Sequence, residues 1–257
     1  NYADIIPEYI VLTIPKDKNY LTKPELFMLD FLSNYKWDRP LHLLSMGGDI
    51  NVGLKDYLMY EGFSYKFVPI KNKTRSTDIG FADAEDLYYK MKNVYKWDAL
   101  KRDDYFADYQ NFYTFCGVLS QRQIFVNVAK EMLKAGDMKR AVEILDMCQE
   151  NVPEETYPLD MTYLGFSNEY MVIEMIESYY KAGAPEKARE LAGKFAGQIL
   201  PSAAFFLNHY DFARQNFEHC YNYIGILADV VEHYGDEQLA EDIRNSYNDI
   251  IGTQAGN

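Results

Sequence analysis

The sequence predicts an α+β protein in which a small βαβαβ unit precedes an all-α array of helical hairpins. Short β-branched segments alternate with amphipathic helical segments before residue 80, and residues 81–257 have helical periodicity almost throughout. The charge divides in the same way. Residues 1–80 hold ten basic and ten acidic side chains, whereas residues 81–257 hold sixteen and twenty-nine. We therefore predict a small α/β domain at residues 1–80 and a helical domain at residues 81–257.

The first domain is predicted from five short segments. In chain order they are a strand at residues 8–15, a helix at 23–34, a strand at 41–46, a short helix at 54–60 and a strand at 65–70. The first helix has the clearest signal, because Thr22 and Glu25 form a capping-box pattern and Pro24 stands in the first turn. Strands separated by helices imply a largely parallel sheet.

Parallel sheets bind ligands at the carboxyl ends of their strands, which points to the loop after the second strand. The candidate ligand-binding residues there are Ser45, Gly47, Gly48, Asp49 and Asn51. Two glycines let a backbone approach a ligand closely, and the next helix would offer its N-terminus to an anion. The loop matches no nucleotide-binding motif, so a tight turn followed by a helix cap is the competing interpretation.

The helical domain is organised around residues 122–153, which have the pattern of one helix-turn-helix repeat. Bulky, small or terminating residues stand where a tetratricopeptide repeat needs them: Phe125, Val128, Ala129, Met132, Ala141, Leu145, Cys148 and Pro153. Gly136, Gly183 and Gly235 each precede an alanine by five residues, as expected for related turns. The glycines are 47 and 52 residues apart, so we predict a degenerate, tetratricopeptide-like array of about three hairpins.

Five side chains are candidates for lining a groove between the hairpins: Tyr109, Tyr113, Arg122, Tyr179 and Tyr180. Aromatic rings in such a groove could hold a peptide or stack on sugar rings. The competing interpretation is that most of the tyrosines fill helix interfaces and leave their hydroxyls at the rim.

Signals for chemistry are weak throughout the chain. Neither a nucleophile-elbow nor a zinc-protease motif occurs, and Glu218, His219 and Cys220 are adjacent on a helix and cannot converge on one ion. We expect no metal and no cofactor. The net charge of -13 disfavours nucleic acid and basic-patch membrane binding. The three cysteines are expected to be buried apolar residues, although one disulfide remains an alternative.

Several segments together resemble the C-terminal soluble region of a bacterial family of multi-pass membrane proteins of unknown function. They are Pro7 to Ile10, Thr13 to Lys16, Tyr20 to Leu26, Trp37 to Leu41, Tyr60 to Gly62 with Val68 and Pro69, the helix with Asp108, Arg122, Phe125 and Ala129, and the hairpins around Gly136 and Gly183. The membrane part of that family is similar to protein O-mannosyltransferases. The resemblance implies an extracytoplasmic position, on the periplasmic face of the inner membrane, and a catalytic acid in the membrane part outside this chain.

The leading functional hypothesis is therefore a non-catalytic domain of a glycosyltransferase-like membrane protein. It would bind or position an acceptor polypeptide, a glycan or a partner protein, and would meet the membrane only through an upstream region. Two alternatives stay open. One is a structural or oligomerisation tail without a ligand, and the other is a small enzyme or ligand-binding site at residues 45–51.

Overall fold

The computed structural model describes residues 6–14, 16, 18–45, 53–72, 81–105, 118–161 and 168–255. The chain forms two compact units, residues 1–94 and residues 95–257. The first unit thus includes a helix, α2 (Ala84–Asn93), that the sequence analysis assigned to the helical domain. The reason is that β4 (Phe81–Ala82), directly before α2, pairs with the sheet, and Lys90 of α2 forms an ion pair with Glu61.

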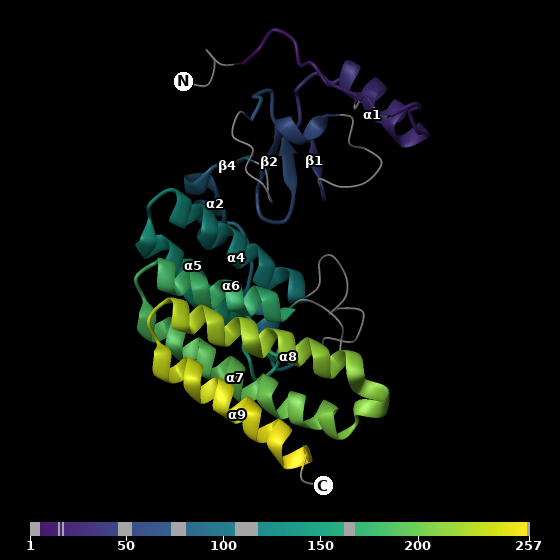
Figure 1. Ribbon diagram of the computed structural model, residues 1–257. Helices are drawn as coiled ribbons and strands as arrows, with labels where there is room; N and C mark the ends of the chain where they lie inside the picture. The colour runs from purple at the N-terminus through teal and green to yellow at the C-terminus, as the bar shows by residue number, and fades with distance from the viewer. Residues whose placement is uncertain are drawn as a thin grey trace. The chain divides into compact units, whose positions relative to one another are not determined.

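In its described residues, the first unit holds one mixed sheet and two α-helices (Figure 1). Its elements before β4 are α1 (Lys23–Ser33), β1 (His42–Leu43), the 3₁₀ helix η2 (Leu54–Tyr57), β2 (Leu58–Tyr60) and β3 (Tyr65–Phe67). The strand order is β1-β3-β2-β4. β3 is antiparallel to both of its neighbours, and only β2 and β4 are parallel. The observed class is therefore α+β, as predicted.

The predicted βαβαβ order with a parallel sheet is wrong. Residues 8–14 are extended but join no sheet. Ile10 and Leu12 alternate inward to pack on the core, while the Thr13 backbone lies against Gly53. The predicted helix at 54–60 is one 3₁₀ turn that leads into β2, because Leu58 to Tyr60 pair with Tyr65 to Phe67. Gly62, with φ of 91°, allows the tight turn of this hairpin.

The core of the first unit explains why α1 forms where it was predicted. Leu54, Tyr57, Leu58 and Phe67 are buried, and α1 adds Met28, Leu29 and Leu32 from one face. The predicted capping box is present: Glu25 Oε2 accepts a hydrogen bond from the Thr22 backbone N–H at 2.7 Å. Glu25 is itself buried, and its pairing with Lys18 lowers the pKa of the carboxyl group below its usual value.

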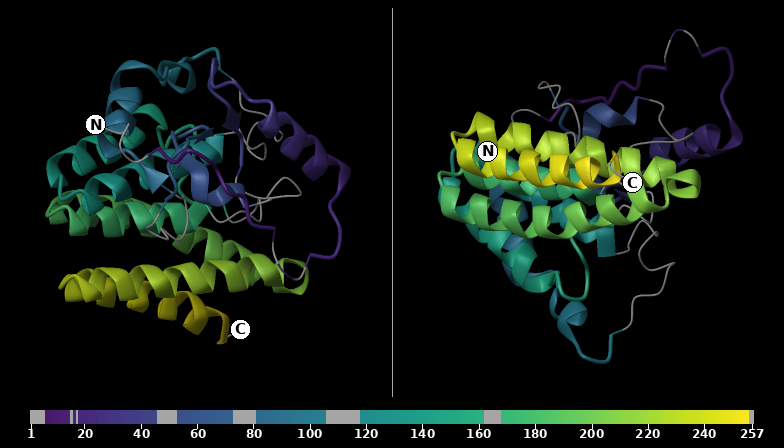
Figure 2. Two further views of the ribbon diagram at one scale, coloured as in Figure 1. Left: turned by 90° about the horizontal axis from the view of Figure 1, so that it is seen from above. Right: turned by 60° about the horizontal axis from the view of Figure 1, so that its bottom comes forward.

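The second unit is helical. After a 3₁₀ turn, η3 (Asp98–Lys101), it contains α4 (Val118–Lys134), α5 (Met138–Asn151), α6 (Asn168–Lys181), α7 (Pro185–Asn208), α8 (Tyr210–His233) and α9 (Glu237–Ala255). They form three successive hairpins, α4/α5, α6/α7 and α8/α9, that pack side by side (Figures 1 and 2). The predicted hairpin at residues 122–153 is therefore confirmed. Seven of its eight repeat positions are buried, from Phe125 to Cys148, and Pro153 is partly buried.

The three hairpins share one turn geometry. Gly136, Gly183 and Gly235 have φ of 78°, 75° and 88°. At the first turn the Gly136 N–H donates to the Leu133 carbonyl and the Asp137 N–H to the Met132 carbonyl, which is a Schellman motif. The same two bonds recur at the other two glycines. The alanine five residues after each glycine is completely buried, so the prediction for these turns is confirmed.

The hairpins differ in length. α5 and α6 have 14 residues each, but α7 and α8 have 24. Residues 200–215 comprise the end of α7 and the start of α8. Among the described residues, none of the helices combines the length and the apolar run needed to cross a bilayer.

Candidate functional site

Tyr179 and Tyr180, two of the groove candidates, lie in the interior of the helical unit. The Tyr179 hydroxyl donates to Asp146 Oδ1 at 2.9 Å and accepts from Gln149 Nε2 at 2.7 Å, so it ties α6 to α5. Burial, together with the charge of Asp146, raises the pKa of this hydroxyl well above its usual value. Tyr179 is thus a neutral hydrogen-bonding group between two hairpins.

Tyr180 joins the second hairpin to the third. Its ring stacks on Tyr234 with centroids 4.7 Å apart, and its hydroxyl donates to Asp236, which also accepts from Arg189 at 2.6 Å. Burial raises the pKa of Tyr180 as well. For both tyrosines the structure shows the helix-interface packing that was the competing interpretation. Tyr109 and Tyr113 lie outside the described residues.

Arg122 is the largest fully buried side chain of the described chain, with 1% of its surface exposed. Its guanidinium donates to the Pro158 carbonyl at 2.9 Å, to Asn168 Oδ1 at 3.0 Å and to the Tyr157 carbonyl. All three acceptors are neutral, and burial lowers the pKa of Arg122. Arg122 therefore holds the connection between α5 and α6 against the helices.

Three further polar side chains fasten the same connection. Asn168 Nδ2 donates to the Leu159 carbonyl at 2.7 Å, Glu169 Oε1 accepts from the Met161 N–H at 2.7 Å, and Gln198 Oε1 accepts from the Leu159 N–H at 2.7 Å. Because α4, α6 and α7 each contribute, we call Arg122, Asn168, Glu169 and Gln198 the connection clamp. The sequence analysis assigned no role to the last three, since their acceptors and donors are backbone groups that leave no motif.

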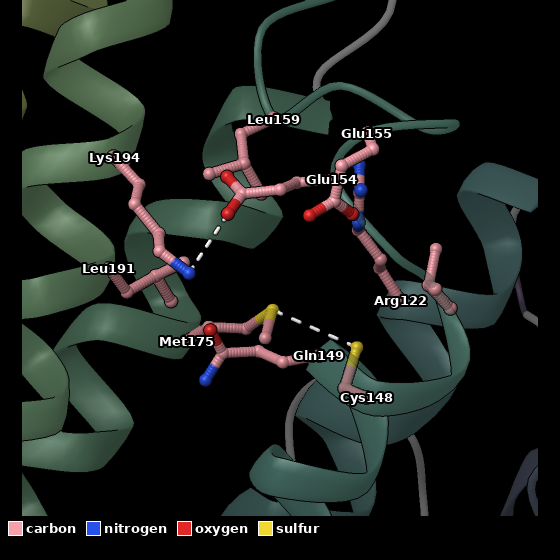
Figure 3. A pocket seen from close by; sticks show the side chains of 10 residues that line it. Arg122, Cys148, Gln149, Glu154, Glu155, Leu159, Met175, Leu191 and Lys194 are labelled. Atoms are coloured by element: carbon pink, nitrogen blue, oxygen red, sulfur yellow. Dashed lines mark hydrogen bonds and ion pairs between the residues drawn. The ribbon is translucent and has the colours of Figure 1, made fainter.

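A cavity of about 110 Å³ lies beside the clamp, between α5, α6, α7 and the connection (Figure 3). Its lining is Arg122, Cys148, Gln149, Val152, Glu154, Glu155, Leu159, Met175, Leu191 and Lys194. At its mouth Lys194 Nζ is 2.9 Å from Glu154 Oε1. The cavity is smaller than the roughly 300–1,000 Å³ of typical ligand pockets, which favours a few water molecules as its content.

Cys148 is the thiol among the lining residues, and its environment suppresses its reactivity. Burial raises the pKa of the thiol to about 12, so it stays protonated near neutral pH. Its sulfur lies 3.9 Å from the Met175 sulfur (Figure 3). Within the described residues, no three His, Cys, Asp or Glu side chains come together to hold a metal ion.

Ser45 is exposed at the end of β1, whereas Gly47, Gly48, Asp49 and Asn51 lie outside the described residues. A polar cluster lies on the sheet that precedes this loop. We call it the Glu61 cluster and define it as His42, Glu61, Ser64, Lys66 and Lys90. The buried Glu61 carboxylate is 2.8 Å from Lys90 Nζ, 3.5 Å from His42 Nδ1 and 3.9 Å from Lys66 Nζ.

The arrangement of the Glu61 cluster limits its chemistry. Ser64 Oγ lies 3.1 Å from Nδ1 of His42, the same ring nitrogen that faces Glu61. A serine-histidine-acid relay needs the serine and the acid on opposite ring nitrogens. Burial acts to lower the pKa of Lys90, but hydrogen bonds to Asp86 and Glu61 outweigh it and raise the pKa. The cluster is suited to holding a polar group rather than to acyl transfer.

The Glu61 cluster was not predicted, because its members come from β1, the β2–β3 turn, β3 and α2 and are brought together only by strand pairing. The pairing of His42 with Lys66 places these two side chains beside each other.

Comparison with known proteins relates the first unit to one family. Residues 1–86 match the family described as TMEM260-associated domain 2. The match spans the whole sheet and the start of α2, including four of the five residues of the Glu61 cluster. No curated protein and no solved structure matches the chain. The first unit is thus similar to a TMEM260-associated domain.

Proposed function

We propose that the chain is a non-catalytic domain of a glycosyltransferase-like membrane protein, on the extracytoplasmic side, that binds or positions an acceptor polypeptide, a glycan or a partner protein. The observation that carries the proposal is the series of three helical hairpins with identical Schellman turns. Repeated hairpins build extended surfaces that serve mainly in binding.

The helical unit supports a binding role in a second way. Its buried side chains that could take part in a reaction are occupied in packing contacts and hydrogen bonds between the hairpins. They are Arg122, Cys148, Tyr179 and Tyr180. The contacts between first helices, α4 with α6 and α6 with α8, are the arrangement expected of a tetratricopeptide-like array. The longer α7 and α8 depart from the repeat of about 34 residues.

The membrane setting is supported by the family match of the first unit and by the resemblance described above. The match of residues 1–86 is to a domain named for its association with a membrane protein. The segments quoted for the resemblance add the link to protein O-mannosyltransferases, which we keep as part of the proposal.

The proposal is tested with the 257-residue chain on a glycan array and on an array of peptides from secreted proteins. We expect saturable binding to one class of probe. A chain with Arg122→Met, whose hairpins are loosened, should bind that class more weakly, and Arg102→Ala should bind as the unchanged chain does. Absence of binding to both arrays would favour a structural tail instead.

The Glu61 cluster favours a second candidate function, a site for a small polar ligand on the first unit. Histidine, serine and two lysines around a buried carboxylate could recognise a ligand with both hydroxyl and anionic groups. Nuclear magnetic resonance of the His42 ring during titration with monosaccharides and sugar phosphates would test it. A shift that Ser64→Ala abolishes would support the site, and an unchanged spectrum at millimolar ligand would exclude it.

A further inference from the structure

The turn between α7 and α8 carries a group of exposed aromatic rings. Five of the thirteen residues from 205 to 217 are Phe or Tyr. Phe212 is 82% exposed, Phe205 is 55% exposed and Tyr210 is 39% exposed. We call Phe205, His209, Tyr210 and Phe212 the aromatic tip. In Figure 1 this turn lies at the right-hand end of the helices, opposite the turn that joins α8 to α9.

The aromatic tip is preformed. His209 alone separates the two helices, and its carbonyl accepts hydrogen bonds from the N–H groups of Phe212 and Ala213. Its ring contacts Phe205 at 4.6 Å and Phe212 at 5.3 Å between centroids, so it holds the two phenyl rings on either side. The Arg214 guanidinium lies 6.0 Å from the Tyr210 ring centre. Ring contacts of this kind reduce the conformational entropy that the exposed side chains lose at binding.

The tip is also electrically neutral within an acidic chain. Residues 195–217 contain one Asp and one Arg, whereas the whole chain has a net charge of -13. An exposed apolar group of this kind marks an interaction surface. Its neutrality excludes recognition of a strongly charged partner and suits a surface without net charge.

We propose that the aromatic tip inserts into the polar-apolar boundary of a neutral lipid bilayer. Phenyl and tyrosyl rings partition to this boundary. Arg214 beside them is paired with Glu218 at 2.7 Å, so the two charges next to the tip cancel. A second copy of the chain fits less well. A stable dimer needs about 20–30 residues from each partner, whereas the tip offers a handful, and two acidic chains repel one another.

This inference rests on the membrane setting of the proposed function. It adds a second contact with the membrane to the one that an upstream region of the protein would make. It explains why the turn between α7 and α8, which connects two hairpins, is rich in phenylalanine. The turns within the three hairpins contain glycine instead. Insertion of the tip would hold the free end of the α7/α8 pair at the membrane, and thereby fix the direction in which the hairpin surface faces an acceptor.

The test is flotation of the 257-residue chain with phosphatidylcholine vesicles. We expect cofractionation that neither phosphatidylglycerol nor high salt strengthens. The double variant Phe205→Ser/Phe212→Ser should reduce the partition coefficient at least tenfold. Ile226→Ser is the matched control, because it removes an exposed apolar residue of α8 outside the tip and should leave partition unchanged.

A depth measurement separates insertion from loose adsorption. Phe212→Trp should be quenched by lipids brominated on the acyl chain, and Ile226→Trp should not. Equal quenching of both, or no flotation of the unchanged chain at millimolar lipid, would overturn the proposal. Sedimentation that shows a dimer dissociated by the double variant would assign the tip to a second copy instead. Array binding by an unchanged chain that does not float with the vesicles would refute the role of the tip and leave the proposed function standing.

Discussion

At the scale of single residues, the helical unit is held by buried polar side chains that hydrogen-bond to the backbone of a distant segment. Arg122 illustrates what a sequence can and cannot predict. Its neighbours Phe125 and Val128 could be placed in the core from helical spacing, and they are buried. Arg122 was expected in a groove, but its acceptors belong to Tyr157 and Pro158, about 35 positions later in the chain. No local pattern records such a contact.

Arg122→Met should destabilise the chain by about 2–4 kcal/mol, because the carbonyls of Tyr157 and Pro158 would stay buried without their donor. Urea unfolding of the helical unit measures this. Arg102→Ala is the control: Arg102 pairs with Asp104 on the surface, where solvent screens the pair, so its loss should leave the unfolding midpoint nearly unchanged. Equal losses for the two variants would contradict the assigned role of Arg122.

Glu169 makes the stability of the protein depend on pH. Burial raises the pKa of its carboxyl group above the usual value, and nearby Asp160 acts in the same direction, while His219, 3.5 Å away, opposes them. A raised pKa in the folded state means that the protonated form is favoured by folding. The contribution of Glu169 to stability is therefore present at acid pH and is lost as the pH rises through the folded pKa.

Glu169→Gln should accordingly remove part of the pH dependence of the protein's stability. The amide oxygen can still accept a hydrogen bond from the Met161 N–H, but it carries no charge. We expect the stability of the variant relative to the unchanged chain to increase from pH 4 to pH 7. Thermal unfolding at both pH values measures the difference. A relative stability that falls over the same interval would show that the ionised form is the one the fold favours.

At the scale of elements, the features that could be predicted from the sequence are those set by residues close together in the chain. The three glycine turns and the capping box of α1 depend on residues within one helical turn, and each was found where the pattern placed it. The sheet depends on pairing between segments of two or three residues. Strands this short have little periodicity of their own, so the antiparallel hairpin at Gly62 was mistaken for a helix and a separate strand.

Gly183→Ala should destabilise the chain by about 1–2 kcal/mol, because a side chain is strained at φ of 75° although nothing lies within 4 Å of the added methyl group. Gly193→Ala, in the exposed middle of α7, also meets nothing within 4 Å and should stabilise by about 0.5–1 kcal/mol. Changes of opposite sign in the free energy of unfolding of the two variants, measured with urea, would confirm the left-handed conformation of Gly183. A neutral Gly183→Ala would contradict it.

Lys90→Ala tests whether α2 belongs to the first unit. The substitution leaves the buried Glu61 carboxylate without its 2.8 Å partner, so we expect a loss of about 1–3 kcal/mol. Hydrogen exchange should become faster in α2 and in β2 and β3, and the helical hairpins should keep their protection. Lys92→Ala, exposed on the same helix, is the control. Faster exchange confined to α4 and α5 would argue against this assignment.

At the scale of the whole molecule, a small sheet unit similar to a TMEM260-associated domain is followed in the chain by a hairpin array with one aromatic end. The two units and their different compositions could be anticipated, since charge and periodicity change along the chain. The Glu61 cluster, the connection clamp and the aromatic tip could not, because each depends on residues that only folding brings together or exposes.

The central claim, that the chain positions an acceptor and does not perform chemistry, is tested most directly by acceptor kinetics in membranes that contain the intact protein with and without residues 1–257. Sugar transfer from a lipid-linked donor would be measured to a folded protein acceptor and to a short peptide. We predict that removal raises KM for the protein acceptor at least tenfold and leaves kcat for the peptide within about twofold, since binding energy alone would be lost. Loss of kcat for the peptide, with KM for the protein unchanged, would contradict the account.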